Sequence, residues 1–249
     1  MMSRLFPKKY KTFIILAIFG IAMGFLEAIV VVYLREIYYP QGFEFPLNTF
    51  SPEMLSIEWI REISTIIMLI TIGIIAGKNF LQKLSFFLYT FAIWDIFYYV
   101  ALKLFLNWPP SLLTWDILFL IPVPWVGPVL APIICSLTMI LLGGSIVFLQ
   151  EKGYIVKIQL FDWVLLFLGA FIIFCTFIWN YFRIIVQEEL LSSFWTLANN
   201  EHLQEIISQY KPTYYNWWIF AVGEILILFT LILIFRRSKS IIYNKVAKE

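Results

Sequence analysis

The chemically unusual residues of this sequence are ionisable side chains placed inside long apolar runs. Glu27, Asp95 and Glu224 each lie within such a run, far from any position where an acid would cap a helix. A charge near the centre of a bilayer costs about 2.5–3.5 kcal/mol on insertion scales, so such residues are rare there unless they have a role. These three acids therefore indicate either a functional site or a structural pair, formed with Arg61 or with each other.

A second group of polar residues lies closer to the ends of the apolar runs. Glu58, Arg61 and Glu62 are spaced by three and four residues, which places them on one face of a helix. The same pattern also fits an ordinary interfacial ion cluster. Asp116 follows Thr114 and fits the first turn of a helix, where the helix dipole favours an acid, so capping is its simplest interpretation.

When the chain is threaded antiparallel through a membrane, these groups fall in the same half of the bilayer. Acids from several separate helices at similar depth indicate one shared site. We therefore predict an outward-facing cavity with carboxylate and aromatic walls. The predicted ligand-binding residues are Glu27, Glu58, Arg61, Glu62, Asp95, Tyr98, Tyr99, Asp116, Trp125, Asn180 and Glu224.

The residues needed for several familiar chemistries are missing from the sequence. His202 is the only histidine, which argues against bis-histidine haem, HExxH zinc and carboxylate–histidine di-iron sites. P-loop, G-x-G-x-x-G and G-x-S-x-G motifs are also missing. We accordingly predict no metal site and no cofactor, and the sequence singles out no catalytic residue.

Three functions remain open. The first is binding or proton-coupled transport of a cationic small solute, because carboxylates supply charge and aromatic faces add about 0.5–2 kcal/mol of cation–π attraction, while a buried acid can exchange its proton for the cation. The second is an intramembrane acid–base enzyme acting on a lipid or isoprenoid. The third is a membrane subunit whose polar cluster contacts protein partners that the sequence does not identify. We favour the first, because all the parts it needs are visible.

These polar groups must be positioned by helices that cross a membrane. The chain has 249 residues, of which 61% are hydrophobic and only 14% charged, and its mean hydropathy is +0.86. Soluble domains are about 45–50% apolar and about 25% charged, so a soluble globular enzyme, a disordered chain and a coiled coil are excluded. A net charge of +2 without a basic face excludes a nucleic-acid partner. The expected partner is the lipid bilayer.

Apolar runs of bilayer-spanning length recur along the chain and predict a single all-α membrane domain over residues 1–249. The first run follows a basic N-terminus, as in a signal peptide. It is too long for one, however, and no A-x-A cleavage site follows, so we expect it to be retained. The predicted six-span bundle comprises residues 12–34, 54–77, 82–106, 127–149, 161–184 and 217–235.

The distribution of Lys and Arg predicts how the bundle sits in the membrane. Placing the N-terminus inside leaves only five of the 18 Lys and Arg residues in outer segments or outer helix halves. Cytoplasmic loops are enriched in these residues. We therefore predict a multi-pass protein of the plasma (cytoplasmic, or inner) membrane with both termini in the cytoplasm.

Two segments depart from the simple pattern of spans. Residues 111–149 are too long for one span and contain several prolines, which remove amide donors. There we predict a short helix near 112–121, a break at 121–125 and then the fourth span. The outer loop 187–216 has apolar residues at helical spacing with acids between them, which predicts one or two amphipathic helices on the outer surface.

Small residues form stripes on the first two spans. Gly20, Gly24 and Ala28 form one stripe, and Gly73 and Gly77 form the other. Such stripes let helices approach closely. They predict helix packing and imply no function.

Overall fold

Six long helices and one short β-hairpin make up the part of the chain that the computed structural model describes, residues 8–48, 50–121, 123–187 and 208–246. Each helix is long and apolar enough to cross a membrane, which confirms the predicted all-α bundle of six spans. The elements are α1 (Lys8–Tyr38), α2 (Pro52–Ala76), α3 (Phe80–Leu106), β1 (Trp115–Phe119), β2 (Trp125–Pro128), α4 (Leu130–Glu151), α5 (Leu160–Gln187) and α7 (Trp217–Val246).

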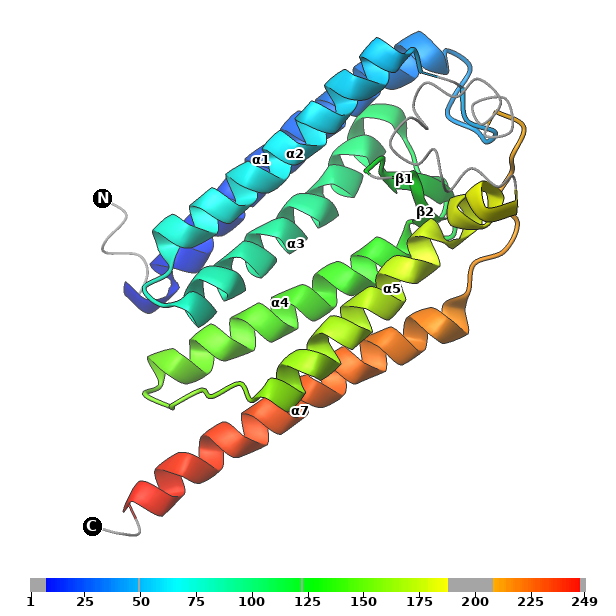
Figure 1. Cartoon of the computed structure of the whole chain (residues 1–249). Helices are drawn as coiled ribbons and strands as arrows, with labels where there is room; N and C mark the ends of the chain where they lie inside the picture. The colour runs from blue at the N-terminus through cyan, green and yellow to red at the C-terminus, as the bar shows by residue number, and fades with distance from the viewer. Residues whose placement is uncertain (1–7, 49, 122, 188–207, 247–249) are drawn as a thin grey trace.

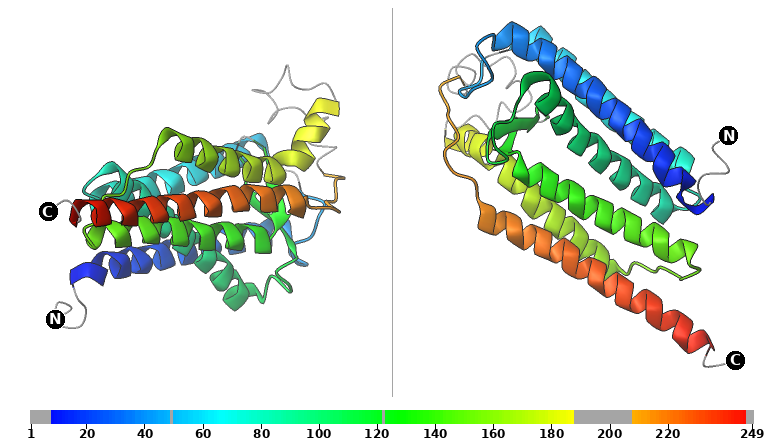
Figure 2. Two further views of the ribbon diagram at one scale, coloured as in Figure 1. Left: turned by 90° about the horizontal axis from the view of Figure 1, so that it is seen from below. Right: turned by 180° about the vertical axis from the view of Figure 1, so that it is seen from behind.

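The helices form two groups of three that meet along one seam (Figures 1 and 2). In the first group α3 packs against α1 and α2, and in the second α7 packs against α5 and α4. The seam is the contact between α3 and α4. It is tight at Gly143, where a Cβ would lie 2.6 Å from the carbonyl oxygen of Ser85. The seam therefore fixes how the two groups sit against each other.

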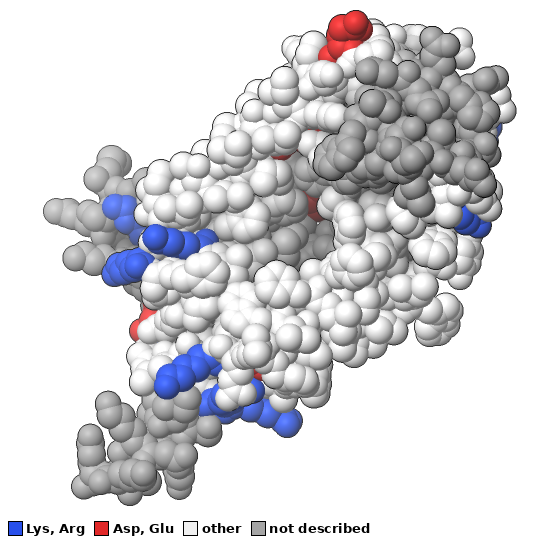
Figure 3. Space-filling model, viewed as in Figure 1, with Lys and Arg blue, Asp and Glu red and all other residues white. Residues whose placement is uncertain are grey.

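The two ends of the bundle differ in structure and charge. The start of α1, the end of α7 and the α2–α3 and α4–α5 connections lie at one end, which we call the terminal end (Figure 1). The hairpin lies toward the other, the hairpin end. Basic side chains gather mainly at the terminal end (Figure 3). One of them, Arg237, lies 2.5 Å from the fully buried carboxylate of Asp162 near the start of α5. The asymmetry of charge is the one that the sequence predicts.

The predicted short helix near 112–121 is wrong, because this segment forms a strand. β1 pairs antiparallel with β2, with Trp115 opposite Pro128 and Phe119 opposite Trp125. Aromatic and β-branched residues favour strands, and the prolines of this region prevent a helix from continuing. β2 is mostly buried and packs against α5 and α4. β2 is therefore enclosed by protein, the setting in which non-helical backbone is tolerated in a membrane protein.

The hairpin also corrects two related expectations. Asp116 lies on β1, opposite Gly127 of β2, so its interpretation as a helix-capping acid is wrong. The fourth span starts slightly later than predicted, at Leu130, because residues 125–128 belong to β2. Asp116 thereby comes to face the ends of the helices in the first group.

The predicted amphipathic helices of loop 187–216 fall largely on residues 188–207, which lie outside the described residues. α5 extends to Gln187, and residues 208–216 form a turn and irregular structure that leads into α7. The amphipathic helices stay a prediction.

The α1–α3 contact offers a test of the small-residue stripe. A Cβ on Gly24 would lie 2.7 Å from the carbonyl oxygen of Trp94 and 2.9 Å from the backbone nitrogen of Tyr98. Because backbone atoms cannot yield as a flexible side chain does, we expect Gly24→Ala to lower the free energy of unfolding by about 1–3 kcal/mol. Thermal unfolding of the purified chain in detergent measures the loss. Gly144→Ala is the matched control, since a Cβ there would meet nothing within 4 Å; equal stability of the two variants would contradict the close approach.

Candidate functional site

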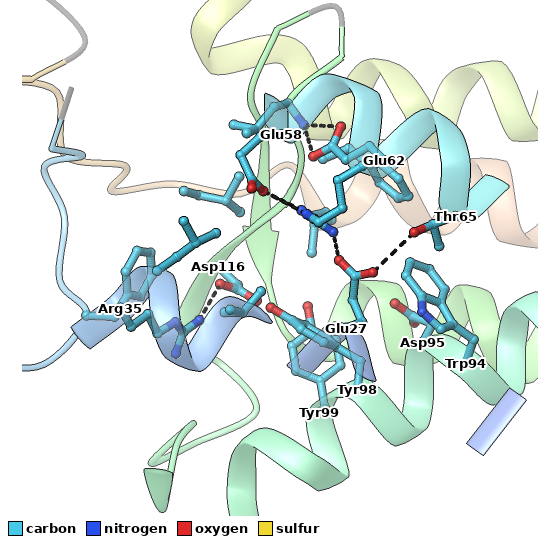
Figure 4. Close-up of a pocket in the computed structure, with 18 of the residues that line it drawn as sticks. Glu27, Arg35, Glu58, Glu62, Thr65, Trp94, Asp95, Tyr98, Tyr99 and Asp116 are labelled. Atoms are coloured by element: carbon cyan, nitrogen blue, oxygen red, sulfur yellow. Dashed lines mark hydrogen bonds and ion pairs between the residues drawn. The ribbon is translucent and has the colours of Figure 1, made fainter. Parts of the chain in front are cut away.

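A cavity of about 100 Å³ lies among α1, α2, α3 and β1. We call it the polar chamber. Acids from all four elements gather around it, as the close-up shows (Figure 4). Eight of the eleven predicted ligand-binding residues line it: Glu27, Glu58, Arg61, Glu62, Asp95, Tyr98, Tyr99 and Asp116.

The Arg61 guanidinium joins carboxylates from two helices. Its Nη2 lies 2.7 Å from Oε2 of Glu58, one turn earlier on α2, and its Nη1 forms an ion pair with Glu27 of α1. The hydroxyl of Thr65 donates a hydrogen bond of 3.3 Å to the other oxygen of Glu27. Glu58 is buried. The cluster therefore lies inside the protein and ties α1 to α2, which argues against an ordinary interfacial cluster.

Glu62 holds the end of β1. The backbone N–H of Leu120, the residue after the strand, donates to both carboxylate oxygens of Glu62 at 2.9 and 3.0 Å. This contact explains how a buried acid on α2 is satisfied, and it attaches the hairpin to the first group of helices.

Arg35 is the second cation of the chamber. The predicted ligand-binding residues did not include it. Its Nη2 lies 3.1 Å from Oδ1 of Asp116, and both side chains are buried. The guanidinium also lies over the rings of Trp108 and Phe43, at 3.8 and 4.5 Å from their centroids. Burial raises the pKa of Asp116 above its usual range, while Arg35 opposes the rise. These contacts fasten β1 to the end of α1.

Aromatic side chains form much of the remaining wall. The rings of Tyr98 and Tyr99 meet edge to face with centroids 4.9 Å apart, and Trp94 packs beside Phe119 of β1. The indole N–H of Trp94 is buried and has no hydrogen-bond partner within the described residues. The chamber therefore offers aromatic surface as well as carboxylates.

Charges in the polar chamber are unbalanced. Among its described lining residues, the carboxyl groups are those of Glu27, Glu58, Glu62, Asp95 and Asp116, and the guanidinium groups are those of Arg35 and Arg61. In this part of the chain Glu62 and Asp95 accept hydrogen bonds from neutral donors and form no ion pair. With every group ionised, the chamber would hold a surplus of three negative charges. Protons or a bound cation can supply the balance.

A second cavity, of about 400 Å³, adjoins the polar chamber. Asp95, Leu118 and Phe119 line both. The second cavity lies among α3, α4, α5, α7 and the hairpin, and its described walls are apolar or aromatic except at Asp95, Thr138 and Glu224. We call it the apolar cavity. The molecule is hollowed in this region on the face that Figure 3 shows, with carboxylate surface visible inside.

Hydroxyl groups of α4 hold the two acids of the apolar cavity. Ser136 donates to Oδ2 of Asp95 at 2.8 Å, and Thr138 donates to Oε2 of Glu224 at 2.7 Å. The other oxygen of Glu224 is buried and has no hydrogen-bond partner among the described residues. Ser136 and Thr138 were not predicted, but hydroxyls within an apolar run are the signal that would have indicated partners for buried acids.

The predicted residues Trp125 and Asn180 lie outside the polar chamber. Trp125 lines the apolar cavity, where its indole N–H donates to the carbonyl oxygen of Ile121 at 2.7 Å across the hairpin turn. Asn180, on α5, lines neither cavity. The structure thus brings ten of the eleven predicted residues to two adjoining cavities.

The described residues contain no group of three or more His, Cys, Asp or Glu side chains arranged to hold a metal ion. No protein-family model, curated protein or solved structure matches the chain. The two cavities are therefore the features of the chain that bear on its function.

Proposed function

We propose that this multi-pass membrane protein binds a cationic small solute in the polar chamber. One observation supports this above the others: among the described residues, five carboxyl groups and only two guanidinium groups surround one small cavity. Buried acids that lack a counter-charge are costly at membrane depth, so a cation that enters the chamber replaces the protons that otherwise balance them.

The chamber walls also suit a cation that carries carbon. Trp94, Tyr98 and Tyr99 present aromatic surface beside the carboxylates. A cation over an aromatic face gains about 0.5–2 kcal/mol, and more when it is desolvated. A small organic ammonium ion would use both kinds of wall, whereas a small inorganic ion such as Mg²⁺ holds its water shell tightly and would depend mainly on the carboxylates.

Exchange of protons for the solute would make binding depend on pH, and across a membrane it would support proton-coupled transport. Binding should weaken as the pH falls, because protons compete for the same carboxylates. The basic terminal end would face the cytoplasm by the positive-inside rule. The chamber, which lies toward the hairpin end, would then open to the outer side of the plasma membrane.

Calorimetric titration tests the proposal directly. The full chain in nanodiscs is titrated with tetramethylammonium or ethylammonium chloride, with sodium chloride at equal ionic strength as the reference. We expect saturable binding of at least one organic cation, weakened at least about tenfold in Asp95→Asn and in Glu27→Gln, because each removes one carboxylate charge.

Glu36→Gln is the matched control, since Glu36 is exposed on α1 and does not line the chamber. Either of two results would overturn the proposal: failure of both organic cations to bind, or equal affinity in the parent and the two chamber variants. The sequence alternatives of an intramembrane acid–base enzyme and a membrane subunit stay predictions.

A further inference from the structure

The proposed binding of a small cation in the polar chamber makes no use of the apolar cavity, although the two cavities share a wall. It is about four times the volume of the chamber, at about 400 against about 100 Å³. Its size lies in the range of small-molecule sites, about 300–1,000 Å³. Asp95, Leu118 and Phe119 form the shared wall, so any ligand at Asp95 lies beside both spaces.

Polar groups of the apolar cavity are confined to one level. Asp95 and Glu224 are bound by Ser136 and Thr138, which are two residues apart on α4, so both acids lie at nearly the same depth in the bundle. Toward the terminal end the lining residues are apolar or aromatic. This part of the cavity is lined by Leu84 and Leu88 of α3. They lie about 16 and about 10 Å from Asp95 along the helix, in the direction of the terminal end.

The opposite wall at that depth is equally apolar. Leu142 of α4 and Leu166, Phe167 and Ala170 of α5 line it. Phe167 and Ala170 are exposed, which is consistent with a cavity that reaches the lateral surface of the bundle. The cavity is therefore acidic near Asp95 and Glu224 and apolar toward the terminal end. It opens toward the face of the molecule that hydrocarbon would cover (Figure 3).

From this arrangement we infer that the solute is an amphiphile, with a cationic head and one hydrocarbon chain. The inference rests on the proposed function and names its substrate class. The head lies at Asp95, where the two cavities meet, with the carboxylates and rings of the polar chamber around it. The chain extends from there toward the terminal end between α3 and α5, along the apolar part of the cavity.

A set of related ammonium ions tests this inference. The parent chain in nanodiscs is titrated with tetramethylammonium and with butyl-, hexyl- and octyltrimethylammonium, and affinities are expressed against the free aqueous concentration. Burial of each added methylene group should raise affinity about threefold or more. Intrinsic fluorescence detects binding, because Trp94 and Trp125 line the two cavities.

Filling the apolar cavity should remove this dependence on chain length without affecting the head. Ala170→Phe inserts a ring from α5, and Leu88→Trp adds volume from α3, so that loss of folding in one leaves the other. Each should bind tetramethylammonium as the parent does while octyltrimethylammonium loses at least about tenfold. Ala22→Phe is the control, because Ala22 is exposed on α1 and lines neither cavity.

The possible results distinguish a failure of the amphiphile inference from a failure of the proposed function. If tetramethylammonium binds but longer chains gain nothing, the solute is a small cation and the amphiphile inference is wrong while the proposed function stands. The inference is also wrong if the gain with chain length persists unchanged in the folded cavity-filling variants. If none of the ammonium ions binds the parent, the proposed function fails and the inference fails with it.

Discussion

Replacing Arg35 with methionine should lower the free energy of unfolding by about 3–5 kcal/mol, the range measured when one partner of a buried ion pair is removed. Asp116 is only 2% exposed, and Arg35 is the cation that faces it. The substitution also removes the stacking of the guanidinium on Trp108 and Phe43. Since these contacts fasten β1 to α1, we expect the hairpin to loosen before the helices do.

The loss should depend on pH. Burial raises the pKa of Asp116 and Arg35 opposes the rise, so removal of Arg35 raises this pKa further. An acid whose pKa is higher in the folded state than in the unfolded state contributes stability at low pH and loses it as the pH rises through the folded value. Arg35→Met should therefore be closest to the parent in acid and fall progressively below it toward neutral and alkaline pH.

Thermal unfolding in detergent across a pH series measures both effects. Arg183→Met is the matched control, because Arg183 is an exposed arginine on α5, and surface changes are usually within about 0.5 kcal/mol. A double variant, Arg35→Met with Asp116→Leu, should recover part of the lost free energy of unfolding, because it removes the buried acid that has no counter-charge. A deficit that is the same at every pH would argue against this account of Asp116.

Arg61→Met should produce a large change in ligand binding, in the opposite sense to the acid variants. It leaves Glu27 and Glu58 without their shared cation and increases the negative surplus of the polar chamber. One elementary charge at about 4 Å contributes about 4 kcal/mol at an effective dielectric constant of about 20. The chain should be less stable when empty and should bind the organic ammonium ion at least about tenfold more tightly.

A paired variant keeps this prediction testable. Arg61→Met with Glu27→Gln restores the parent's charge balance, so its stability and affinity should both return toward those of the parent. Calorimetry measures affinity, and thermal unfolding with and without tetramethylammonium measures stability. If Arg61→Met folds but abolishes cation binding, Arg61 is itself part of what recognises the ligand, and the charge-surplus argument is wrong.

The bundle and much of its polar interior could be predicted because the bilayer imposes simple constraints. A span needs a long apolar run, and an acid within such a run must find partners inside the protein. Those two rules were enough to indicate the six helices and to place Glu27 and Asp95 in one region. They did not need any knowledge of how the helices pack.

The hairpin and Arg35 were missed for different physical reasons. A short apolar segment such as 112–121 fits a strand or a buried helix equally well, and only its pairing with 125–128 decides between them. Arg35 lies near the end of a span, where a cation commonly reaches toward headgroups. Its actual partner is 81 residues away. The apolar cavity could not be predicted from the sequence either, because it exists only where side chains of separate helices leave the space between them unfilled.

The hydrogen bonds from α4 to two acids have a mechanical consequence. Ser136 binds an acid on α3, in one helix group, and Thr138 binds an acid on α7, in the other. Since α4 itself belongs to the second group, the Ser136–Asp95 bond crosses the seam, whereas the Thr138–Glu224 bond lies within the second group. Loss of the charge on Asp95 would therefore weaken a contact between the two helix groups, and loss of the charge on Glu224 would weaken one within the second group.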